Sequence, residues 1–314
     1  MNAGSSRPAG RPALAPILLV AVALVLDVLA SLAMSRHVQQ WLPVQASSAA
    51  PAVDDLFALE AGIGTFIFLG CLAVIGWTLL FNRARKYDMD NGDPIEGNLP
   101  LEIVWTLVPL VLVIALSLQA IRVNQQLASL GGKVRVRDAG SALALAAGAT
   151  SGEPVGPIQV LGRQWSWEFI YPEGVHSSEL HLPVDQRIEL ELISLDVLHG
   201  FYVPAFRLKQ DLVPGSVIRY ALTPTRSGRY RLRDSMFSGG YFAANQTDVV
   251  VQSEEEFRAW LQQALRRPLA PAANPAQELW SRRQRRGDRG WATVPPAPPP
   301  LVHVDTDPTA PHEA

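Results

Sequence analysis

The chain has 314 residues, a length sufficient for two ordinary domains. Hydrophobic residues make up 48% of it and charged residues only 18%, and the mean hydropathy is +0.12. This composition argues against a purely soluble protein and indicates a membrane protein with a soluble part. The net charge of −2 gives no indication of a nucleic-acid partner. The single cysteine excludes a disulfide framework and any metal site built on a pair of cysteines.

Three apolar segments are long enough to cross a membrane, because a hydrocarbon core of about 30 Å needs about 20 helical residues. They are residues 14–34, 56–81 and 101–121, and the last two belong to a two-helix hairpin over residues 56–122. Asp27 lies within the first segment, where a charge costs roughly 2.5–3.5 kcal/mol, so we expect it to face a protein neighbour unless the segment is cleaved. Cys71 lies within the second and reads as a small helix-packing residue.

The distribution of basic residues predicts the orientation of these spans. Arginines and lysines follow the second segment directly and also occur in the stub of residues 1–13 (Arg83, Arg85, Lys86, Arg7 and Arg11). The stub and the 82–100 loop are therefore expected in the cytoplasm, and the chain after Ile121 outside it. The first segment also fits a cleavable signal peptide, because its start is basic and Ser31 and Ala33 are small. A signal core is usually shorter than this segment, so a retained helix is favoured.

The remaining chain is predicted to form an all-β domain with flanking segments. Residues 131–157 are rich in Gly, Ala and Ser and are typical of a flexible connector. Short β-type runs broken by turn residues then occupy residues 158–252, which predicts a Greek-key sandwich. Residues 253–265 begin with a serine followed by three glutamates and predict a short helix. Residues 266–314, rich in Pro and Arg and without periodicity, are predicted to be a disordered tail.

Three motifs give the chain its resemblance to a known family. They are IEGNLPLEIVWTLVP at the third apolar segment, GRQWSWEF at the start of the β region, and DVLHGFYVPAFRLKQDLVPG around His199. Together they resemble subunit II of haem–copper terminal oxidases. Within that family, the chain resembles most the alternative, quinol-type oxidase of cyanobacteria. The resemblance runs from about residue 54 to residue 251. It implies that the sandwich is cupredoxin-like and is anchored by the transmembrane helices.

In that family the sandwich usually holds a binuclear copper centre whose ligand loop reads CxExCGxxHxxM, with a further histidine in a DVxH motif. Only His199 matches here, and the other positions hold different residues (Asp234 and Ser238 at the cysteines, Met236 at the glutamate, Phe242 at the histidine and Asn245 at the methionine). A mixed-valence copper pair needs bridging thiolates, so we predict that this chain binds no binuclear copper. A single copper ion on His199, with Asp234 and His181 or His176, remains an alternative.

Loss of the copper ligands implies a quinol-oxidising member of the family, whose electrons come from a membrane quinol at subunit I. Haem and copper are then expected in subunit I, and the partners are subunit I, subunit III and membrane lipid, without nucleic acid. This chain is expected to be a non-catalytic subunit of an oxygen-reducing, proton-translocating complex. The alternatives are a cytochrome c oxidase subunit II that accepts electrons from cytochrome c, and a membrane scaffold without a redox role.

Glu102 is the residue most directly connected with chemistry. In LPLEIVWT it matches a family glutamate at the cytoplasmic mouth of a proton channel, and an acid at that end of a span is suitably placed for proton relay. The alternative is an ordinary interfacial acid at a helix start, where the helix dipole favours it. Trp165 and Trp167 match the aromatic run at the family's cytochrome docking face, but without copper we expect them to pack in the sandwich.

Overall fold

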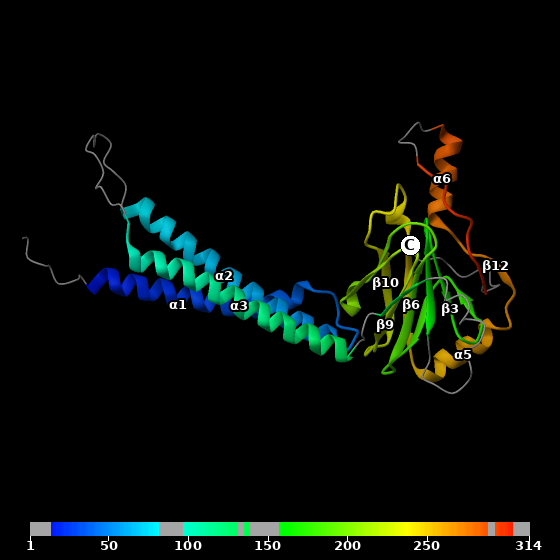
Figure 1. Cartoon of the computed structure of the whole chain (residues 1–314), viewed down its shortest axis with the longest axis horizontal. Helices are drawn as coiled ribbons and strands as arrows, with labels where there is room; N and C mark the ends of the chain where they lie inside the picture. The colour runs from blue at the N-terminus through cyan, green and yellow to red at the C-terminus, as the bar shows by residue number, and fades with distance from the viewer. Residues whose placement is uncertain (1–13, 82–96, 131–134, 139–156, 288–292, 304–314) are drawn as a thin grey trace, which may run out of the picture. The chain divides into compact units, whose positions relative to one another are not determined.

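The computed structural model describes residues 14–81, 97–130, 135–138, 157–287 and 293–303. The predicted stub, the basic residues of the 82–100 loop, and parts of the predicted connector and tail lie outside these described residues. The chain divides into two compact units. One, the helical unit, contains the chain up to Leu42 and residues 54–121, and the other, the outer domain, contains residues 43–53 and the chain from Arg122 onward (Figure 1).

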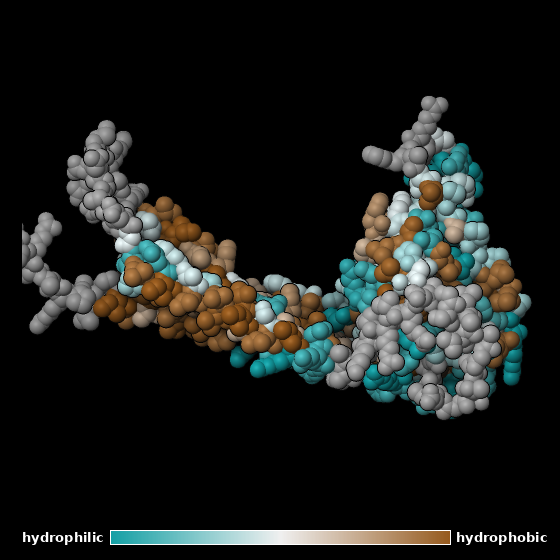
Figure 2. Space-filling view, viewed as in Figure 1, coloured by the Kyte–Doolittle hydropathy of each residue, from teal (hydrophilic) through white to brown (hydrophobic). Residues whose placement is uncertain are grey.

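The helical unit consists of three long helices, which confirms the three predicted spans. They are α1 (Leu14–His37), α2 (Ala50–Phe81) and α3 (Leu99–Leu130), with a short 3-10 helix η1 (Val38–Trp41) after α1. Each is long and apolar enough to cross a membrane. Most of their leucine, valine and phenylalanine side chains are exposed, and Figure 2 shows a largely hydrophobic surface over these helices. This is the surface expected of helices whose solvent is lipid.

Small residues bring α1 and α2 close together. A Cβ atom placed on Gly62 would lie 3.1 Å from the Cβ of Ser35, and one placed on Gly70 would lie 3.6 Å from Oδ2 of Asp27. Ser31, between the two contacts, is buried and donates a 3.3 Å hydrogen bond to Oδ1 of Asp27. The carboxyl group of Asp27 therefore faces a helix neighbour, as expected for an acid within a span.

The outer domain is a sandwich of two sheets, which confirms the predicted all-β fold. The six-stranded sheet has the order β1 (Arg135–Asp138), β9 (Ser216–Leu222), β6 (Ile188–Ser194), β2 (Ile158–Arg163), β3 (Ser166–Ile170) and β4 (His176–Ser177). The five-stranded sheet has the order β5 (Leu180–Pro183), β11 (Gln246–Gln252), β10 (Gly228–Asp234), β7 (His199–Val203) and β8 (Leu208–Leu212). The pairs β2–β6 and β5–β11 are parallel, and the other pairs are antiparallel.

Apolar side chains from both sheets form the core of the sandwich. Val160, Phe169 and Leu192 contribute from the first sheet, and Phe201 and Leu232 contribute from the second. All five are fully buried. Burial alternates along β2, which has one face on this core, whereas β6 is buried on both faces for most of its length.

Residues 43–53, which comprise the segment between η1 and α2 and the first turn of α2, are part of the outer domain rather than a free loop. The Ala46 N–H donates to the carbonyl of Ala205 at 3.0 Å, and the Ala46 carbonyl accepts from the N–H of Thr225 at 3.0 Å. The Ser47 hydroxyl donates to the carbonyl of Phe206 at 2.8 Å. Ala46 is fully buried in the core cluster. The segment is therefore bound into the sandwich by hydrogen bonds, an isolated bridge between Ser47 and Pro224 and the burial of Ala46, which its sequence did not indicate.

The C-terminal part contains a confirmed helix and a correction. Helix α5 (Glu254–Ala264) begins at Ser253 with a capping box, as its sequence predicts. The prediction of a disordered tail over residues 266–314 is wrong for part of that range, where further elements form. They are β12 (Leu269–Pro271), α6 (Pro275–Arg286) and β13 (Leu301–His303), and β12 pairs with β13. The reason is that α6 has both ends defined, by an Asn274 cap and by Gly287 in the left-handed region, and an apolar face that packs on the sandwich.

The connector prediction needs a smaller correction. Strand β1 lies within the predicted connector of residues 131–157 and pairs with β9, Val136 opposite Ile218. Strands β4 and β8 carry no alternating apolar pattern in the sequence. The β8 segment Leu208–Leu212 reads LKQDL, and its lysine, glutamine and aspartate hide the strand pattern because β8 is an edge strand.

Candidate functional site

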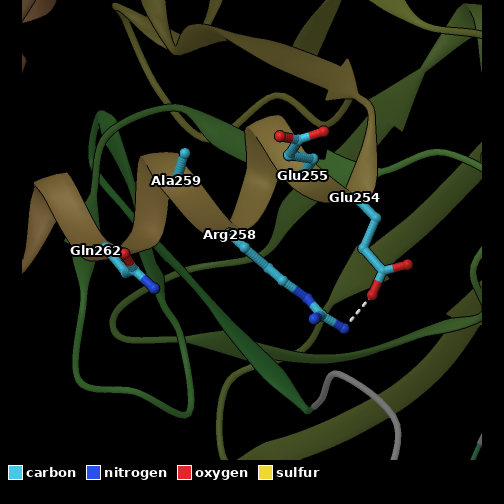
Figure 3. Close-up of a pocket in the computed structure, with 5 residues that line it drawn as sticks. All are labelled: Glu254, Glu255, Arg258, Ala259 and Gln262. Atoms are coloured by element: carbon cyan, nitrogen blue, oxygen red, sulfur yellow. Dashed lines mark hydrogen bonds and ion pairs between the residues drawn. The ribbon is translucent and has the colours of Figure 1, made fainter.

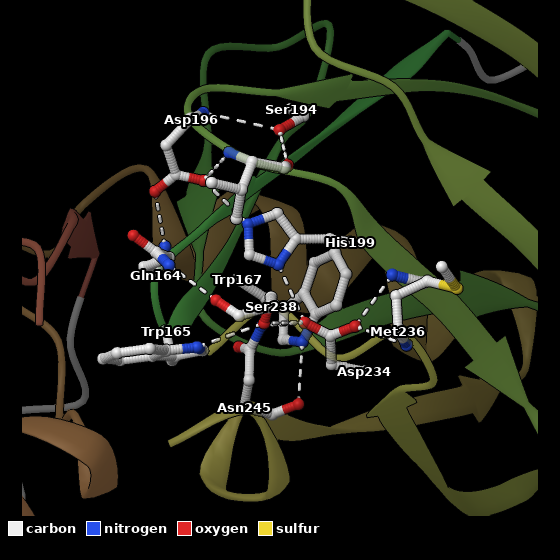
Figure 4. Close-up of polar contacts among 12 residues, drawn as sticks. Gln164, Trp165, Trp167, Ser194, Asp196, His199, Asp234, Met236, Ser238 and Asn245 are labelled. Carbon is white, nitrogen blue, oxygen red and sulfur yellow. Dashed lines mark hydrogen bonds and ion pairs between the residues drawn. The ribbon is translucent and has the colours of Figure 1, made fainter. Parts of the chain in front are cut away.

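The candidate site is a buried polar cluster at one end of the sandwich, here called the His199 cluster (Figure 4). His199 is the first residue of β7 and Asp234 the last residue of β10, and these strands are paired. The turn between β2 and β3, the turn before β7 and the loop after β10 supply the other members. The cluster consists of Gln164, Trp165, Asp196, His199, Asp234, Ser238 and Asn245.

The ring of His199 is fully buried and lies between two carboxylates. Its Nδ1 is 2.8 Å from Oδ2 of Asp234, and its Nε2 is 2.8 Å from Oδ1 of Asp196. Burial lowers the pKa of His199, but the hydrogen bonds and charges of the two aspartates outweigh it and raise the pKa to about 9. Both ring nitrogens therefore donate protons, and the ring is an imidazolium at neutral pH.

Asp234 is held by donors on both of its oxygens. Its Oδ1 accepts from the N–H groups of Gly200, at 2.8 Å, and Met236, at 3.1 Å. Its Oδ2 accepts from the Ser238 hydroxyl at 3.0 Å and the Asn245 amide at 3.1 Å, in addition to His199. Burial raises the pKa of this carboxyl, but the hydrogen bonds lower it by more, so the pKa lies below its ordinary value. Asp234 is thus an anion paired with the imidazolium.

Asp196 completes the charge arrangement from the opposite side of the ring. Its Oδ2 accepts from the Gln164 N–H at 2.7 Å, and its Oδ1 accepts from the Val197 N–H at 2.6 Å. Burial raises its pKa, but the bonds to His199 and to the backbone lower it overall. Two anions around one cation give the cluster a net charge of −1, and the side chain of Asp196 is 29% exposed, so that charge reaches solvent.

The two tryptophans of GRQWSWEF are buried, as expected, and connect the aromatic part of the domain to the cluster. The Trp165 indole N–H donates to the Ser238 hydroxyl at 3.1 Å, and the Trp167 indole N–H donates to the Asn245 carbonyl at 3.2 Å. The ring of Trp167 meets that of His199 edge to face at 6.1 Å. Both rings therefore act as structural donors that hold the loop after β10.

The donors at the former ligand positions do not fit a thiolate-bridged copper pair. Asp234, Ser238 and Asn245 offer carboxylate, hydroxyl and amide groups, none of which delocalises an electron as bridging sulfur does. Phe242 packs on Phe237 and on the aromatic cluster around Trp165 and has no donor atom. Both ring nitrogens of His199 are engaged by carboxylate oxygens at 2.8 Å.

The other histidines of the single-copper alternative contact other groups. The ring of His181 stacks on Trp260 at 3.9 Å, and Nδ1 of His176 lies 2.8 Å from Oε1 of Glu168. In the part of the chain that the structure describes, no three His, Cys, Asp or Glu side chains are arranged to hold a metal ion. The single-copper arrangement is therefore not assembled by these residues.

Glu102 lies in the first turn of α3 and takes part in its cap. Its Oε1 accepts from the Asn98 N–H at 3.2 Å, while Oδ1 of Asn98 accepts from the Leu101 N–H at 3.2 Å. The two side chains thus satisfy backbone donors at the helix start. This local bond agrees with the interfacial reading of Glu102 and leaves its second carboxylate oxygen for other partners.

A shallow pocket on α5 does not involve the cluster. Figure 3 shows that Glu254, Glu255, Arg258, Ala259 and Gln262 line it. Glu254 and Arg258 are paired within the helix across one turn. Such a pair on an exposed helix face is an ordinary solvent-facing feature, and we assign the pocket no function.

Transmembrane helices followed by this sandwich define a membrane-anchored protein with a cupredoxin-like domain. Family models for the transmembrane and periplasmic domains of cytochrome c oxidase subunit II match residues 35–123 and 174–253. The chain belongs to the cytochrome c oxidase subunit II family. It is therefore an integral membrane protein whose C-terminal domain is extracytoplasmic, and a subunit II of a haem–copper oxidase.

Relatives of both electron-donor types are similar to the chain. Cytochrome c oxidase subunit 2 of Thermostichus vulcanus is 35% identical over 72% of this chain and 79% of the relative. Quinol oxidase subunit 2 of Bacillus subtilis is 27% identical over 79% of this chain and 72% of the relative. The periplasmic domain of oxidase subunit II (CoxB) of Bradyrhizobium japonicum is a similar solved structure, at 23% identity, 36% coverage of this chain, 96% of that chain and a TM-score of 0.34.

Proposed function

We propose that this chain is subunit II of a quinol-oxidising haem–copper oxidase and that it binds no binuclear copper. The complex reduces oxygen to water and translocates protons, with haem and copper in subunit I and subunit III as a further partner. Quinol donates its electrons at subunit I. This chain supplies structure and one mouth of a proton channel, and is not itself catalytic.

The observation that carries the proposal is the pairing of His199 with Asp196 and Asp234. Each ring nitrogen of the histidine that would bind copper lies 2.8 Å from a carboxylate oxygen, Nδ1 from Asp234 and Nε2 from Asp196. The ligand loop from Asp234 to Asn245 contains no cysteine, and the chain's only cysteine, Cys71, lies in α2. Hydrogen bonds to carboxylates thus engage His199, and oxygen donors replace sulfur at the positions where the family's motif would place the bridging ligands.

A cytochrome c oxidase role is the second candidate, because relatives carrying that name have the higher identity. Oxygen uptake by the purified complex separates the two candidates. We expect uptake with a reduced quinol and none above background with reduced cytochrome c. Uptake with cytochrome c, together with the near-infrared absorption of a mixed-valence copper pair, would reject the proposal. A purified chain without any haem-bearing partner would instead favour the scaffold.

We further propose that Glu102 delivers protons to subunit I. Glu102→Ala is expected to slow turnover at least several-fold without loss of haem, because it removes an acid at the start of a span. The matched control is Asn98→Ala, which removes the cap side chain that bonds the Leu101 N–H but leaves the carboxylate. Equal slowing by both variants, or none by Glu102→Ala, would assign Glu102 to the helix cap alone.

A further inference from the structure

One face of α6 packs on the end of the sandwich beside the His199 cluster. Ala276, Trp280 and Arg283 share this face by their spacing of four and three residues. Ala276 is fully buried against Trp165 and Tyr241, with Trp280 packed beside them. The guanidinium of Arg283 lies 5.8 Å from the centre of the Tyr241 ring and donates to its hydroxyl at 3.3 Å. The helix is thus held by apolar, cation–π and hydrogen-bond contacts together.

The chain that returns after α6 crosses the same end of the domain. The Ala297 N–H donates to the Gln164 carbonyl at 2.5 Å, next to Trp165 in the turn between β2 and β3. Gly240 lies against Thr293, because a Cβ atom on Gly240 would be 2.9 Å from the threonine hydroxyl oxygen. Residues 293–297 therefore contact two of the loops that enclose the cluster.

Hydrogen bonds hold α6 and residues 293–297 to the domain at both ends of this C-terminal part of the chain. Strands β12 and β13 pair with each other, and the Ala272 N–H donates to the Pro300 carbonyl at 2.9 Å. The His176 N–H donates to Nδ1 of His303 at 2.9 Å, which ties β13 to β4. We call residues 269–287 and 293–303 the C-terminal cover.

The cover lies on a group of aromatic side chains. Trp165 is 1% exposed and Tyr241 is 7% exposed beneath it. Phe242 packs beside them, and Phe237, 78% exposed, meets Phe242 at a ring distance of 5.2 Å. Without the cover, these four rings would form one aromatic surface, which is the composition of strong protein–protein contact sites. Trp165 also bonds directly to Ser238, so this surface is the approach to the cluster.

We propose that the aromatic surface of Trp165, Tyr241, Phe242 and Phe237 is a docking surface that the C-terminal cover occupies. The cover thereby prevents soluble electron-carrier proteins from binding to the outer domain. The inference rests on the proposed function, since a quinol-fed subunit has no use for such a partner. The outer side of α6 adds Arg285 and Arg286, both exposed, which repel a basic carrier.

The test uses the purified oxidase complex with Ala276→Arg, which places a long side chain where Ala276 has no space. Leu279→Arg is the matched control, because it adds the same charge to the exposed side of α6. A second variant ends the chain after Leu265 and removes the cover completely. Hydroxyl-radical labelling with mass spectrometry reports the exposure of Trp165 and Tyr241, and sedimentation at low salt reports binding of reduced cytochrome c.

We expect Ala276→Arg and the truncated chain to raise labelling of Trp165 at least fivefold and to gain cytochrome c binding, while Leu279→Arg does neither. Unchanged labelling in both cover variants would overturn the inference, because the cover would not shield the rings. Increased labelling without gained binding would overturn it as well, because the surface would not be a docking site. Oxygen uptake by the unmodified complex tests the proposed function. The role of the cover is tested separately, by comparing labelling and cytochrome c binding between the variants.

Discussion

In the helical unit the apolar side chains face outward, whereas in the outer domain the same residue types face inward. The hydrogen bonds differ in the same way. Thr65 and Thr106 of the helices donate to carbonyls four residues earlier, at 2.8 Å each. In the outer domain, Asp234 binds His199, which is 35 positions away in the chain.

The difference follows from the two solvents. Lipid offers no hydrogen bonds, so a polar group in a span is satisfied by its own helix or by the neighbouring one. Water surrounds the sandwich, and a buried polar group there can take partners from several strands and loops at once. The outer domain can therefore hold a charged cluster, whereas in the helical unit Asp27 lies at the contact with α2 and Glu102 lies at a helix end.

The largest effect is expected from removing one charge of the cluster. Asp234→Ala leaves the His199 cation without its buried partner and should lower the stability of the outer domain by about 3–5 kcal/mol. Hydrogen exchange of β7 and β10 in the purified complex measures this. Ser238→Ala, which removes one donor to the same carboxylate and the acceptor of the Trp165 indole N–H, is the control and should cost about 1–2 kcal/mol. Equal losses of stability for the two variants would mean that the His199–Asp234 charge pair stabilises the domain no more than one ordinary hydrogen bond does.

Alkaline pH should weaken the same cluster to a smaller extent, because the neutral ring still keeps one hydrogen bond. The pKa of His199 is raised from 6.5 to about 9. The contribution of its charge to the stability of the outer domain is therefore complete below pH 6.5 and disappears as the pH rises through 9. The pKa values of Asp196 and Asp234 lie below 3.8, so their contributions are present above that pH and disappear as the pH falls further.

The cluster therefore stabilises the outer domain most between pH 3.8 and 6.5. Hydrogen exchange of β7 at pH 6, 8 and 9.5 is expected to show progressive loss of protection in the unmodified chain. His199→Gln has no ring to titrate and should flatten this slope although it is less stable at pH 6. A slope that persists in the variant would show that other groups cause it.

The third effect concerns the seam between α1 and α2. Gly62→Leu places a side chain where Ser35 is only 3.1 Å away and should cost about 1–3 kcal/mol through overpacking. Gly64→Leu, in the same helix, meets nothing within 4 Å and is the matched control. Crosslinking between cysteines placed in α1 and α2 measures the contact. Equal crosslinking in both variants would contradict close packing at this seam.

The sequence predicted the features that local pattern determines. The three spans follow from unbroken apolar runs, and the cap at Ser253 follows from one serine and three glutamates. The sandwich follows from short alternating runs, such as the buried positions of β2. Each of these signals lies within about ten residues, where side-chain periodicity and turn chemistry act directly.

Features that depend on distant partners escaped prediction. His199 was singled out, but its second carboxylate, Asp196, was not recognised as a partner, because nothing local shows that both ring nitrogens are paired. Ala46 lies in a connector without an apolar pattern, and it is buried in a core whose other residues, and whose hydrogen-bond partners Ala205 and Thr225, are distant in the chain. For α6 a local signal existed, since Asn274 and Pro275 form a helix start and Ala276 and Trp280 share a face.

The smallest expected effect concerns helix N-caps, and it tests whether a cap stabilises a helix equally in the outer domain and in the helical unit. Ser253 caps α5 in the outer domain, and Asn98 caps α3 at the membrane surface. Ser253→Ala leaves the Glu256 N–H without its side-chain acceptor and should cost about 1 kcal/mol, whereas Ser253→Asp keeps an acceptor and should cost little. Hydrogen exchange in the first turn of α5 measures the loss.

Asn98→Ala should give a similar loss in the first turn of α3, because the bond it removes is of the same kind, from a backbone N–H three residues on. A clearly larger loss at Asn98 would mean that water replaces the missing acceptor less readily there than at Ser253. In that case even a local cap would depend on the surrounding solvent, and the contrast between the two regions would extend from packing to single hydrogen bonds.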